Sequence, residues 1–148
     1  MSLATIVWFW FTLLEPKTEN DELAIAIATV VSEMPPLYAN DPFRYREAAT
    51  LTSIAWYESN FRHGVTGDHG NAHCEFQLWN APKDVDDDRT LCVGLALERV
   101  RESMRLCPKD RPLCMYVSGP KGLHSDRAKV VSDSRMATAK YLVSKFPK

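Results

Sequence analysis

The chain has 148 residues, 45% of them hydrophobic and 25% charged, a composition typical of one globular domain with its own core. The formal net charge is -1 at pH 7, and the lysines and arginines are scattered along the sequence. This balance argues against a nucleic-acid partner and against electrostatic attraction to an anionic surface.

Residues 1–19 contain an uncharged, strongly apolar run over residues 3–14, with aromatic residues 8–11 at its centre. The run is shorter than the roughly 20 residues that cross a bilayer, so we expect no stable membrane span. Two interpretations remain open. The run resembles the core of a signal peptide, although no basic residue precedes it and no small-residue cleavage motif follows. Alternatively, it is a structural segment that packs on a domain formed by residues 20–148.

A first helix is predicted from Asn20 or Asp21 to Met34, where two consecutive prolines end it. Its apolar residues recur at helical spacing. They are expected to face the core: Leu23, Ile27, Val30, Val31 and Met34.

A second helix is predicted to begin with Asp41 as its N-cap and Pro42 at the first helical position. Gly64 marks the exit of the chain from this segment. An apolar stripe at helical spacing leads directly to Glu58: Ala48, Leu51, Ile54 and Ala55.

Glu58 therefore occupies a position where an apolar residue is expected. Transfer of a carboxyl group out of water disfavours its charged form, and general acid catalysis requires a carboxyl that keeps its proton. The alternative is a helix-end residue that reaches solvent or pairs with Arg62, four residues further along.

Residues 64–88 combine glycines, histidines and aspartates, which is typical of a loop or a short hairpin. A third helix is predicted from Asp88 or Thr90 to before Pro108. Its expected inward-facing residues are Leu91, Leu95, Val100 and Met104.

A short helix is predicted over about residues 112–117, and a last helix runs from about Ser125 to Lys145. The candidate core contacts of the last helix are Val130, Val131, Met136, Ala139 and Tyr141. The predicted fold class is thus mainly α, with one irregular or β-containing segment.

Four cysteines permit two disulfides in any of three pairings: Cys74, Cys92, Cys107 and Cys114. Their even number suits an oxidising compartment. Cys107 and Cys114 flank a proline-rich turn, and a local bridge between them would leave Cys74 to pair with Cys92. We predict this pairing. The alternative is four small buried thiols in a reducing compartment.

Three short motifs follow one another between residues 58 and 119. They are Glu58-Ser59-Asn60-Phe61, Cys74-Glu75-Phe76-Gln77 and Met115-Tyr116-Val117-Ser118-Gly119. Over residues 45–140, their order and spacing resemble those of the lysozyme-like lytic transglycosylases and goose-type lysozymes. The motifs of that family are Glu-Ser-x-Phe, a loop of the Gly-Leu-Met-Gln kind, and Ala-Tyr-Asn-x-Gly. The resemblance implies a lysozyme-like fold.

The resemblance also implies cleavage of peptidoglycan between N-acetylmuramic acid and N-acetylglucosamine, with Glu58 protonating the bridging oxygen. In the transglycosylase route the same residue then acts as a base for the sugar's own 6-hydroxyl, which gives a 1,6-anhydro product. No second carboxylate, cofactor or metal is then expected. By the same resemblance, Ser59 orients the carboxyl group, Gln77 binds substrate, and Tyr116 hydrogen-bonds close to Glu58.

The chain departs from the family pattern at Cys74, Glu75 and Val117, where glycine, leucine and asparagine are usual. If Glu75 or Asp68 points into the cleft, it offers a base that activates water. Hydrolysis with inversion is then feasible at carboxyl separations of about 6.5–9.5 Å. Both products remain open at this stage.

Two other classes of function remain. His69 and His73 lie close to Cys74 in the sequence, and with Cys92 they permit a mixed His/Cys zinc site, although the spacing matches no common zinc pattern. A noncatalytic wall-binding or structural module with a lysozyme-like fold is the second alternative, because a fold does not determine a function.

The expected partner is the glycan strand of peptidoglycan. We expect the protein to bind it as a monomer, in the periplasm or outside the cell. A bacterial or a phage-borne origin fits this expectation. Trp79 offers an aromatic face for a sugar ring, whereas Trp56 is expected to pack in the core.

Overall fold

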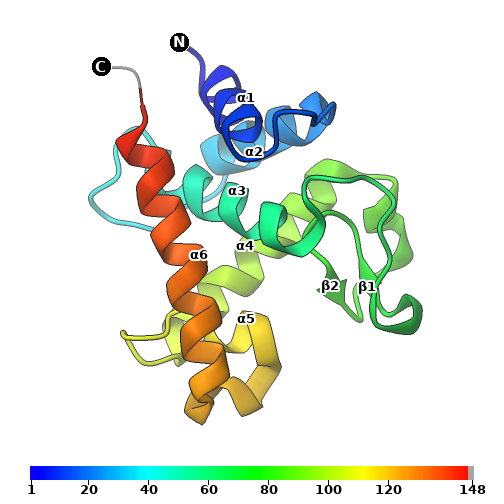
Figure 1. Ribbon diagram of the computed structural model, residues 1–148, viewed down its shortest axis with the longest axis vertical. Helices are drawn as coiled ribbons and strands as arrows, with labels where there is room; N and C mark the ends of the chain where they lie inside the picture. Colours follow the sequence, from blue (N-terminus) through cyan, green and yellow to red (C-terminus); the bar gives the residue numbers. More distant parts are fainter. Residues whose placement is uncertain (147–148) are drawn as a thin grey trace.

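Six α-helices and one two-stranded antiparallel sheet make up most of the regular structure of residues 1–146, the part of the chain that the computed structural model describes (Figure 1). The helices are α1 (Leu3–Leu14), α2 (Asp21–Glu33), α3 (Tyr45–Ser59), α4 (Arg89–Leu106), α5 (Cys114–Ser118) and α6 (Asp126–Ser144). The strands are β1 (Ala72–His73) and β2 (Leu78–Trp79). Three short 3-10 helices are η1 (Asp68–Gly70), η2 (Lys83–Asp86) and η3 (Gly119–His124). The prediction of a mainly α fold with a small β-containing segment is confirmed; residues 147–148 of the predicted domain lie outside the described residues.

Side-chain caps set the start of three helices near the predicted positions. Asn20, Asp88 and Ser125 each accept a hydrogen bond from a backbone N–H of the first turn, in α2, α4 and α6 respectively. Because such a cap satisfies a backbone donor that the helix leaves unpaired, it fixes the first residue of the helix.

The start of α3 differs from the prediction: the helix begins at Tyr45 and not at Pro42. Arg44 adopts a left-handed conformation with φ 61°, which interrupts the helix at that residue. Asp41 still acts as a capping group, because its carboxylate accepts a hydrogen bond from the backbone N–H of Glu47 at 3.1 Å. The prediction of Asp41 as the N-cap is nevertheless wrong, because Arg44 occupies that position, although Asp41 still binds the first turn of the helix.

The other end of α3 lies at Ser59, before the predicted exit at Gly64. Asn60 has a left-handed conformation with φ 52°, a common way to end a helix. Glu58 therefore lies in the last turn, where the helix dipole is negative and a cationic neighbour is favourable.

The helix α1 packs into the main core. Trp10 and Phe11 are fully buried, and the Phe11 ring stacks on Phe61 with 3.9 Å between ring centroids. Burial of each of these rings stabilises the fold by about 1.5–3 kcal/mol. In this structure the apolar segment therefore packs against α2 and α3. Among residues 1–146, no helix has both the length and the apolar character that a bilayer crossing requires.

The pairing of α3 with α6 forms the centre of the molecule. Small residues of α6, Ala128, Ser132 and Ala139, are buried, and the Ser53 hydroxyl donates a hydrogen bond to the carbonyl of Arg135 at 2.8 Å. Three predicted core residues are instead exposed: Leu91, Val130 and Tyr141. These three predictions are wrong because each helix buries a different face. The buried residues include Val93, Ala96, Leu97 and Val100 in α4, and Ala128, Ser132, Ala139 and Leu142 in α6.

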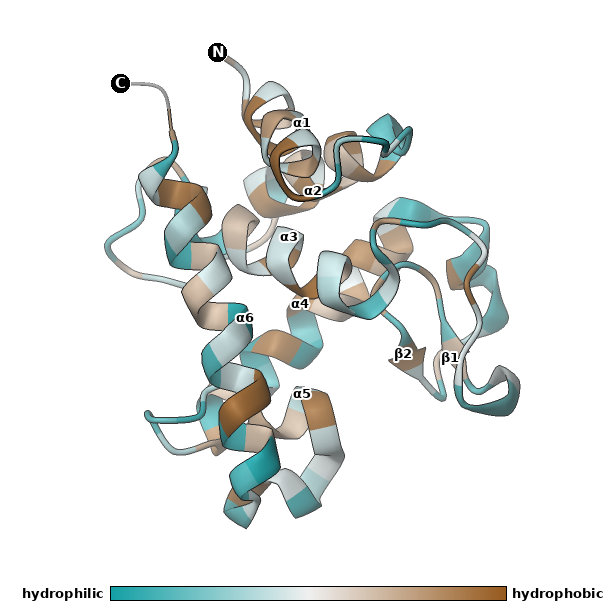
Figure 2. Cartoon of the chain, viewed as in Figure 1, coloured by the Kyte–Doolittle hydropathy of each residue, from teal (hydrophilic) through white to brown (hydrophobic). Residues whose placement is uncertain are grey.

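The hairpin pairs Ala72 with Trp79 and His73 with Leu78. Figure 2 shows hydrophobic residues concentrated in α1, whereas the loops around the hairpin are largely hydrophilic. A disulfide between Cys74 and Cys92 ties the hairpin turn to α4, and a second joins Cys107 to Cys114. The predicted pairing is confirmed, and it replaces the alternative of four free thiols.

Candidate active site

A cleft of about 1000 Å³ lies between the hairpin side of the molecule and a wall made by α4, α5, η3 and α6. Figure 1 shows α3 crossing the centre of the molecule, with the hairpin to one side of its C-terminal end and α5 below it. Glu58, Gln77 and Tyr116 all line this cleft. A separate hollow of about 680 Å³ near the start of α2 contains none of these three residues.

Glu58 is held by an arginine from a distant part of the chain. The Arg135 Nη2 donates to Glu58 Oε1 at 2.6 Å, and the two side chains are 12% and 23% exposed respectively. The same guanidinium lies over the Tyr57 ring, 4.8 Å from its centroid. The alternative partner, Arg62, instead donates to the carbonyl of Ser59. The carboxyl group is therefore fixed at one oxygen and partly open to the cleft.

Tyr116 lies close enough to Glu58 for the charge of the carboxylate to affect the pKa of the Tyr116 hydroxyl. Its hydroxyl donates to the carbonyl of Phe76 at 2.9 Å. Burial of the hydroxyl, followed by the negative charge of Glu58, raises the pKa of Tyr116 well above its ordinary value, and the arginines Arg99 and Arg135 partly oppose this shift. Tyr116 is therefore a neutral donor that joins α5 to the hairpin turn.

Gln77 lines the cleft, and its amide nitrogen binds two backbone carbonyl groups of the segment around the hairpin. The Nε2 group donates to the carbonyls of Val65 and Cys74, at 2.7 Å and 2.9 Å. Its Oε1 lies beside Gly67, where a Cβ atom would come within 2.6 Å of it. Any role in substrate binding thus falls to Oε1, and a residue larger than glycine at position 67 would displace it.

The two other predicted polar residues of this region have different surroundings. Asp68 is exposed and lines the cleft from η1. Ser59 is buried, and its hydroxyl donates to the carbonyl of Ala55 at 3.0 Å, one turn back in α3. Because that bond uses the hydroxyl proton, Ser59 does not orient the Glu58 carboxyl in this structure.

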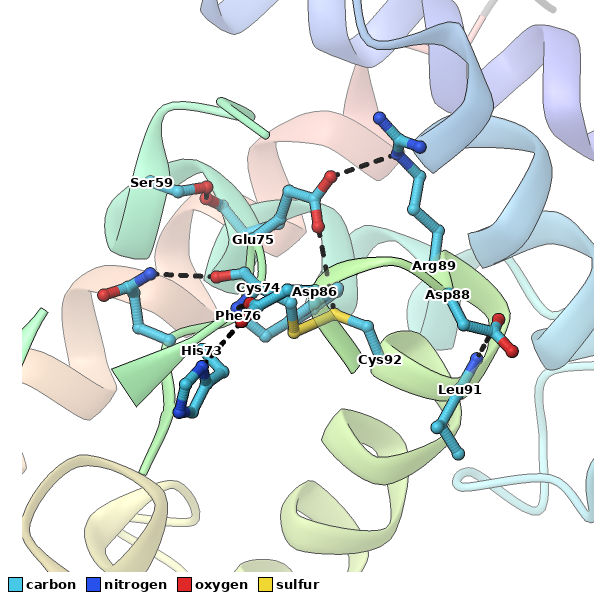
Figure 3. The surroundings of a disulfide bond; sticks show 12 residues. Ser59, His73, Cys74, Glu75, Phe76, Asp86, Asp88, Arg89, Leu91 and Cys92 are labelled. Atoms are coloured by element: carbon cyan, nitrogen blue, oxygen red, sulfur yellow. Dashed lines mark hydrogen bonds and ion pairs between the residues drawn. A yellow bond between two sulfur atoms is a disulfide. The ribbon is translucent and has the colours of Figure 1, made fainter. Parts of the chain in front are cut away.

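Glu75 lies outside the cleft and is completely buried. Its Oε1 receives hydrogen bonds from Asn20 Nδ2 at 2.9 Å and Arg89 Nε at 3.2 Å, and lies 3.2 Å from His63 Nδ1. Figure 3 shows the carboxyl group between Arg89 and the Cys92 sulfur. The structure thus excludes Glu75 as a base in this cleft, which leaves Asp68 as the remaining sequence-predicted candidate.

The geometry does not support the zinc alternative. Cys74, Glu75 and Cys92 are the one group of potential metal ligands brought together within residues 1–146, but the two sulfur atoms are bonded to each other. Neither sulfur is therefore available as a thiolate ligand. His73 is hydrogen-bonded to Asp86 at 2.7 Å, and His69 is exposed.

Among the aromatic residues, Trp79 lines the cleft and is 59% exposed, while Trp56 packs against the main core. Sequence reasoning missed Arg135, which lies 77 residues from its partner Glu58. A weak signal was available, because Arg127, Val131 and Arg135 recur every four residues and therefore share one face of α6.

No protein-family model, no curated protein and no solved structure matches the chain. The functional interpretation therefore depends on the motifs and on the cleft that brings them together.

Proposed function

We propose that the protein cleaves the glycan strands of peptidoglycan, as a lysozyme-like lytic transglycosylase or muramidase with Glu58 as the general acid. The observation that carries the proposal is the meeting of Glu58, Gln77 and Tyr116 in one cleft. The three residues come from separate motifs, and no local constraint of the sequence requires them to line the same cavity.

In the proposed reaction, the proton of the Glu58 carboxyl passes to the oxygen between the two sugars. The bond from that oxygen to the anomeric carbon breaks through an oxocarbenium-like transition state. In the transglycosylase route the sugar's own 6-hydroxyl then bonds to that carbon and returns its proton to Glu58. In the hydrolytic route a water takes the place of the 6-hydroxyl, and Asp68 is the cleft carboxylate available as its base.

Arg135 acts as a positioning residue in this proposal. It binds Oε1 of Glu58, and within residues 1–146 Oε2 has no hydrogen-bond partner. We assign the transferred proton to Oε2, the oxygen that the guanidinium does not occupy. After transfer, the charge on the carboxylate is balanced by the guanidinium at 2.6 Å.

The place of action that we propose is the periplasm or the cell exterior. Two disulfides join the four cysteines, and such bonds persist in oxidising compartments. This is also where peptidoglycan is accessible. The exposed ring of Trp79 on the hairpin side of the cleft supplies a surface on which a sugar ring can stack.

A noncatalytic wall-binding module is the second candidate. The ion pair between Glu58 and Arg135 favours this noncatalytic module. A guanidinium bound to a carboxyl oxygen stabilises a binding surface, and it does so in a protein that catalyses no reaction. Val117 favours it as well, since the resemblance leads us to expect an asparagine at this position.

Digestion of purified peptidoglycan followed by mass spectrometry separates these candidates. A transglycosylase releases muropeptides one water lighter than those with a free reducing end, whereas a muramidase releases reducing ends. Binding to sacculi with no released muropeptide supports the noncatalytic module and contradicts the proposed enzyme. Absence of both binding and release removes both candidates.

A further inference from the structure

The cleft wall formed by α4, η3 and α6 carries three basic residues that form no ion pair within residues 1–146. Arg99 comes from α4, Lys121 from η3 and Arg127 from the first turn of α6, and all three line the cleft. We refer to these three residues as the cationic wall. Their side chains occur in none of the hydrogen bonds or ion pairs of the described part of the chain.

The acidic residues of the cleft do not neutralise this wall. Glu58 is paired with Arg135, and Glu102 is paired with Arg105 at 3.0 Å. Asp68, on η1, is the one other carboxylate that lines the cleft. The chain as a whole has a formal charge of -1, so the positive charge here is a local feature of the cleft.

The fold holds the wall in a defined place relative to Glu58. Arg127 and Arg135 are two turns apart on one face of α6, which separates their Cα atoms by about 12 Å along the helix. Arg99 and Tyr116 line the same cleft from α4 and α5, and the charge of Arg99 partly opposes the rise in the pKa of Tyr116. Arg99 and Arg127 therefore line the same cleft as Glu58 from two different helices.

Lys121 is held by a close contact between backbones. A Cβ atom on the neighbouring Gly122 would lie 2.0 Å from the carbonyl oxygen of Cys114. Since a side chain at position 122 would have to displace the backbone, glycine allows η3 to lie against α5. This contact keeps Lys121 on the wall of the cleft.

We propose that the cationic wall binds carboxylate groups carried by the glycan, so that the cleft prefers acidic wall strands over neutral N-acetylglucosamine polymers. The guanidinium group forms two parallel hydrogen bonds with a carboxylate, a geometry that no neutral sugar hydroxyl provides. The inference rests on the proposed function, because it assigns the substrate class of the same cleft.

Two parts of the wall strand supply such carboxylates. In an intact strand they belong to the stem peptides, and after the peptides are removed they belong to the lactyl groups of the muramic acid residues. Both sources present the same chemistry to the arginines. Strands with and without their peptides distinguish them.

The test measures binding in the Glu58→Gln background, where turnover is suppressed. The probes are peptide-bearing muramyl oligosaccharides, the same compounds with methyl-esterified carboxyls, amidase-treated strands, and a chitooligosaccharide of equal sugar number. The variant Arg99→Gln with Arg127→Gln removes two charges from the wall. Lys109→Gln with Lys140→Gln removes two charges from exposed positions outside the cleft and serves as the matched control.

We expect the wall variant to bind the free-carboxylate probes about tenfold more weakly, the effect of losing one or two charge-assisted hydrogen bonds. Esterification should weaken binding to the parent protein by a similar factor, and the chitooligosaccharide should bind both proteins equally, which also shows that the variant is folded. Weaker binding confined to peptide-bearing probes assigns the stem peptides, and weaker binding confined to amidase-treated strands assigns the lactyl groups.

Equal affinity of the parent and the wall variant for all carboxylate probes overturns the inference. If the wild-type protein still cleaves peptidoglycan in that case, the proposed function stands and only the substrate preference is wrong. If the protein binds no glycan and cleaves none, the proposed function fails and the inference fails with it.

Discussion

Glu58 and Glu75 belong to neighbouring motifs, but the fold gives their side chains very different surroundings. Glu58 lines an open cleft with one cationic partner, Arg135. Glu75 is fully buried, and three side chains from different parts of the chain contact one of its oxygens. The number of partners and the access to the cleft separate a carboxyl group that can react from one that cannot.

The contrast follows from where the two residues lie in the fold. Glu58 occupies the last turn of α3 and projects beside α6, so its surroundings depend on a single helix contact. Glu75 occupies the hairpin turn that a disulfide fastens to α4, and it joins this turn to the start of α2 through Asn20. The first position leaves a carboxyl group that lines the cleft, and the second joins the hairpin turn to the start of α2.

The largest effect on stability is expected for Glu75→Ala. Arg89 keeps its ion pair with Glu22, but Asn20, His63 and Arg89 all lose their contact with the buried carboxyl group. Loss of a hydrogen bond to a charged group costs roughly 1.5–3 kcal/mol for each contact. The matched change Glu58→Ala should cost roughly 1.5–3 kcal/mol, because it removes one charge-assisted hydrogen bond, that of Arg135, in place of three contacts. Urea unfolding followed by circular dichroism measures both. An equal cost for the two variants would contradict the assignment of Glu75 to structure.

The next largest effect is expected from the disulfides. The bond between Cys74 and Cys92 closes a loop of 18 residues, and its loss through paired serine substitutions should cost about 3 kcal/mol. The bond between Cys107 and Cys114 spans 7 residues and should cost about 2 kcal/mol when removed in the same way. Thermal unfolding of the two double variants gives the order of the two costs. A larger cost for the shorter loop would contradict the expected dependence of stability on loop length.

A smaller effect is expected for Tyr116→Phe, which removes the hydrogen bond to Phe76 and should cost about 1 kcal/mol. The pKa of Tyr116 is higher in the folded protein than the ordinary value of 10.0. The folded state therefore holds its proton when the unfolded state has lost it, so stability should fall as the pH rises above about 10. Unfolding measured between pH 8 and pH 11 should show a weaker alkaline decline in the variant; the same decline in both proteins would assign it to other groups.

Local signals in the sequence were sufficient for much of the fold. The caps at Asn20, Asp88 and Ser125 define helix starts because they act within one turn. The spacing of the cysteines around a proline-rich turn was enough to predict the pairing of Cys107 with Cys114. Each of these features depends on neighbours in the sequence.

The remaining features depend on contacts between distant segments. Arg135 meets Glu58 across 77 residues, and no periodicity links the two. Glu75 carries a charge that favours exposure, and its burial became possible only because Asn20, His63 and Arg89 converge on it. Val130 is apolar yet exposed, because α6 buries a different face, which carries Ala128, Ser132, Ala139 and Leu142.

The rate of muropeptide release from purified peptidoglycan by the Glu58→Gln variant tests the central claim most directly. We expect the rate to fall by about 10²–10⁴ relative to the wild-type protein, the usual contribution of a general acid. The control Glu98→Gln makes the same chemical change on α4 outside the cleft and should leave the rate unchanged. Cleavage by Glu58→Gln at a rate close to that of the wild-type protein would contradict the role of Glu58 as the acid.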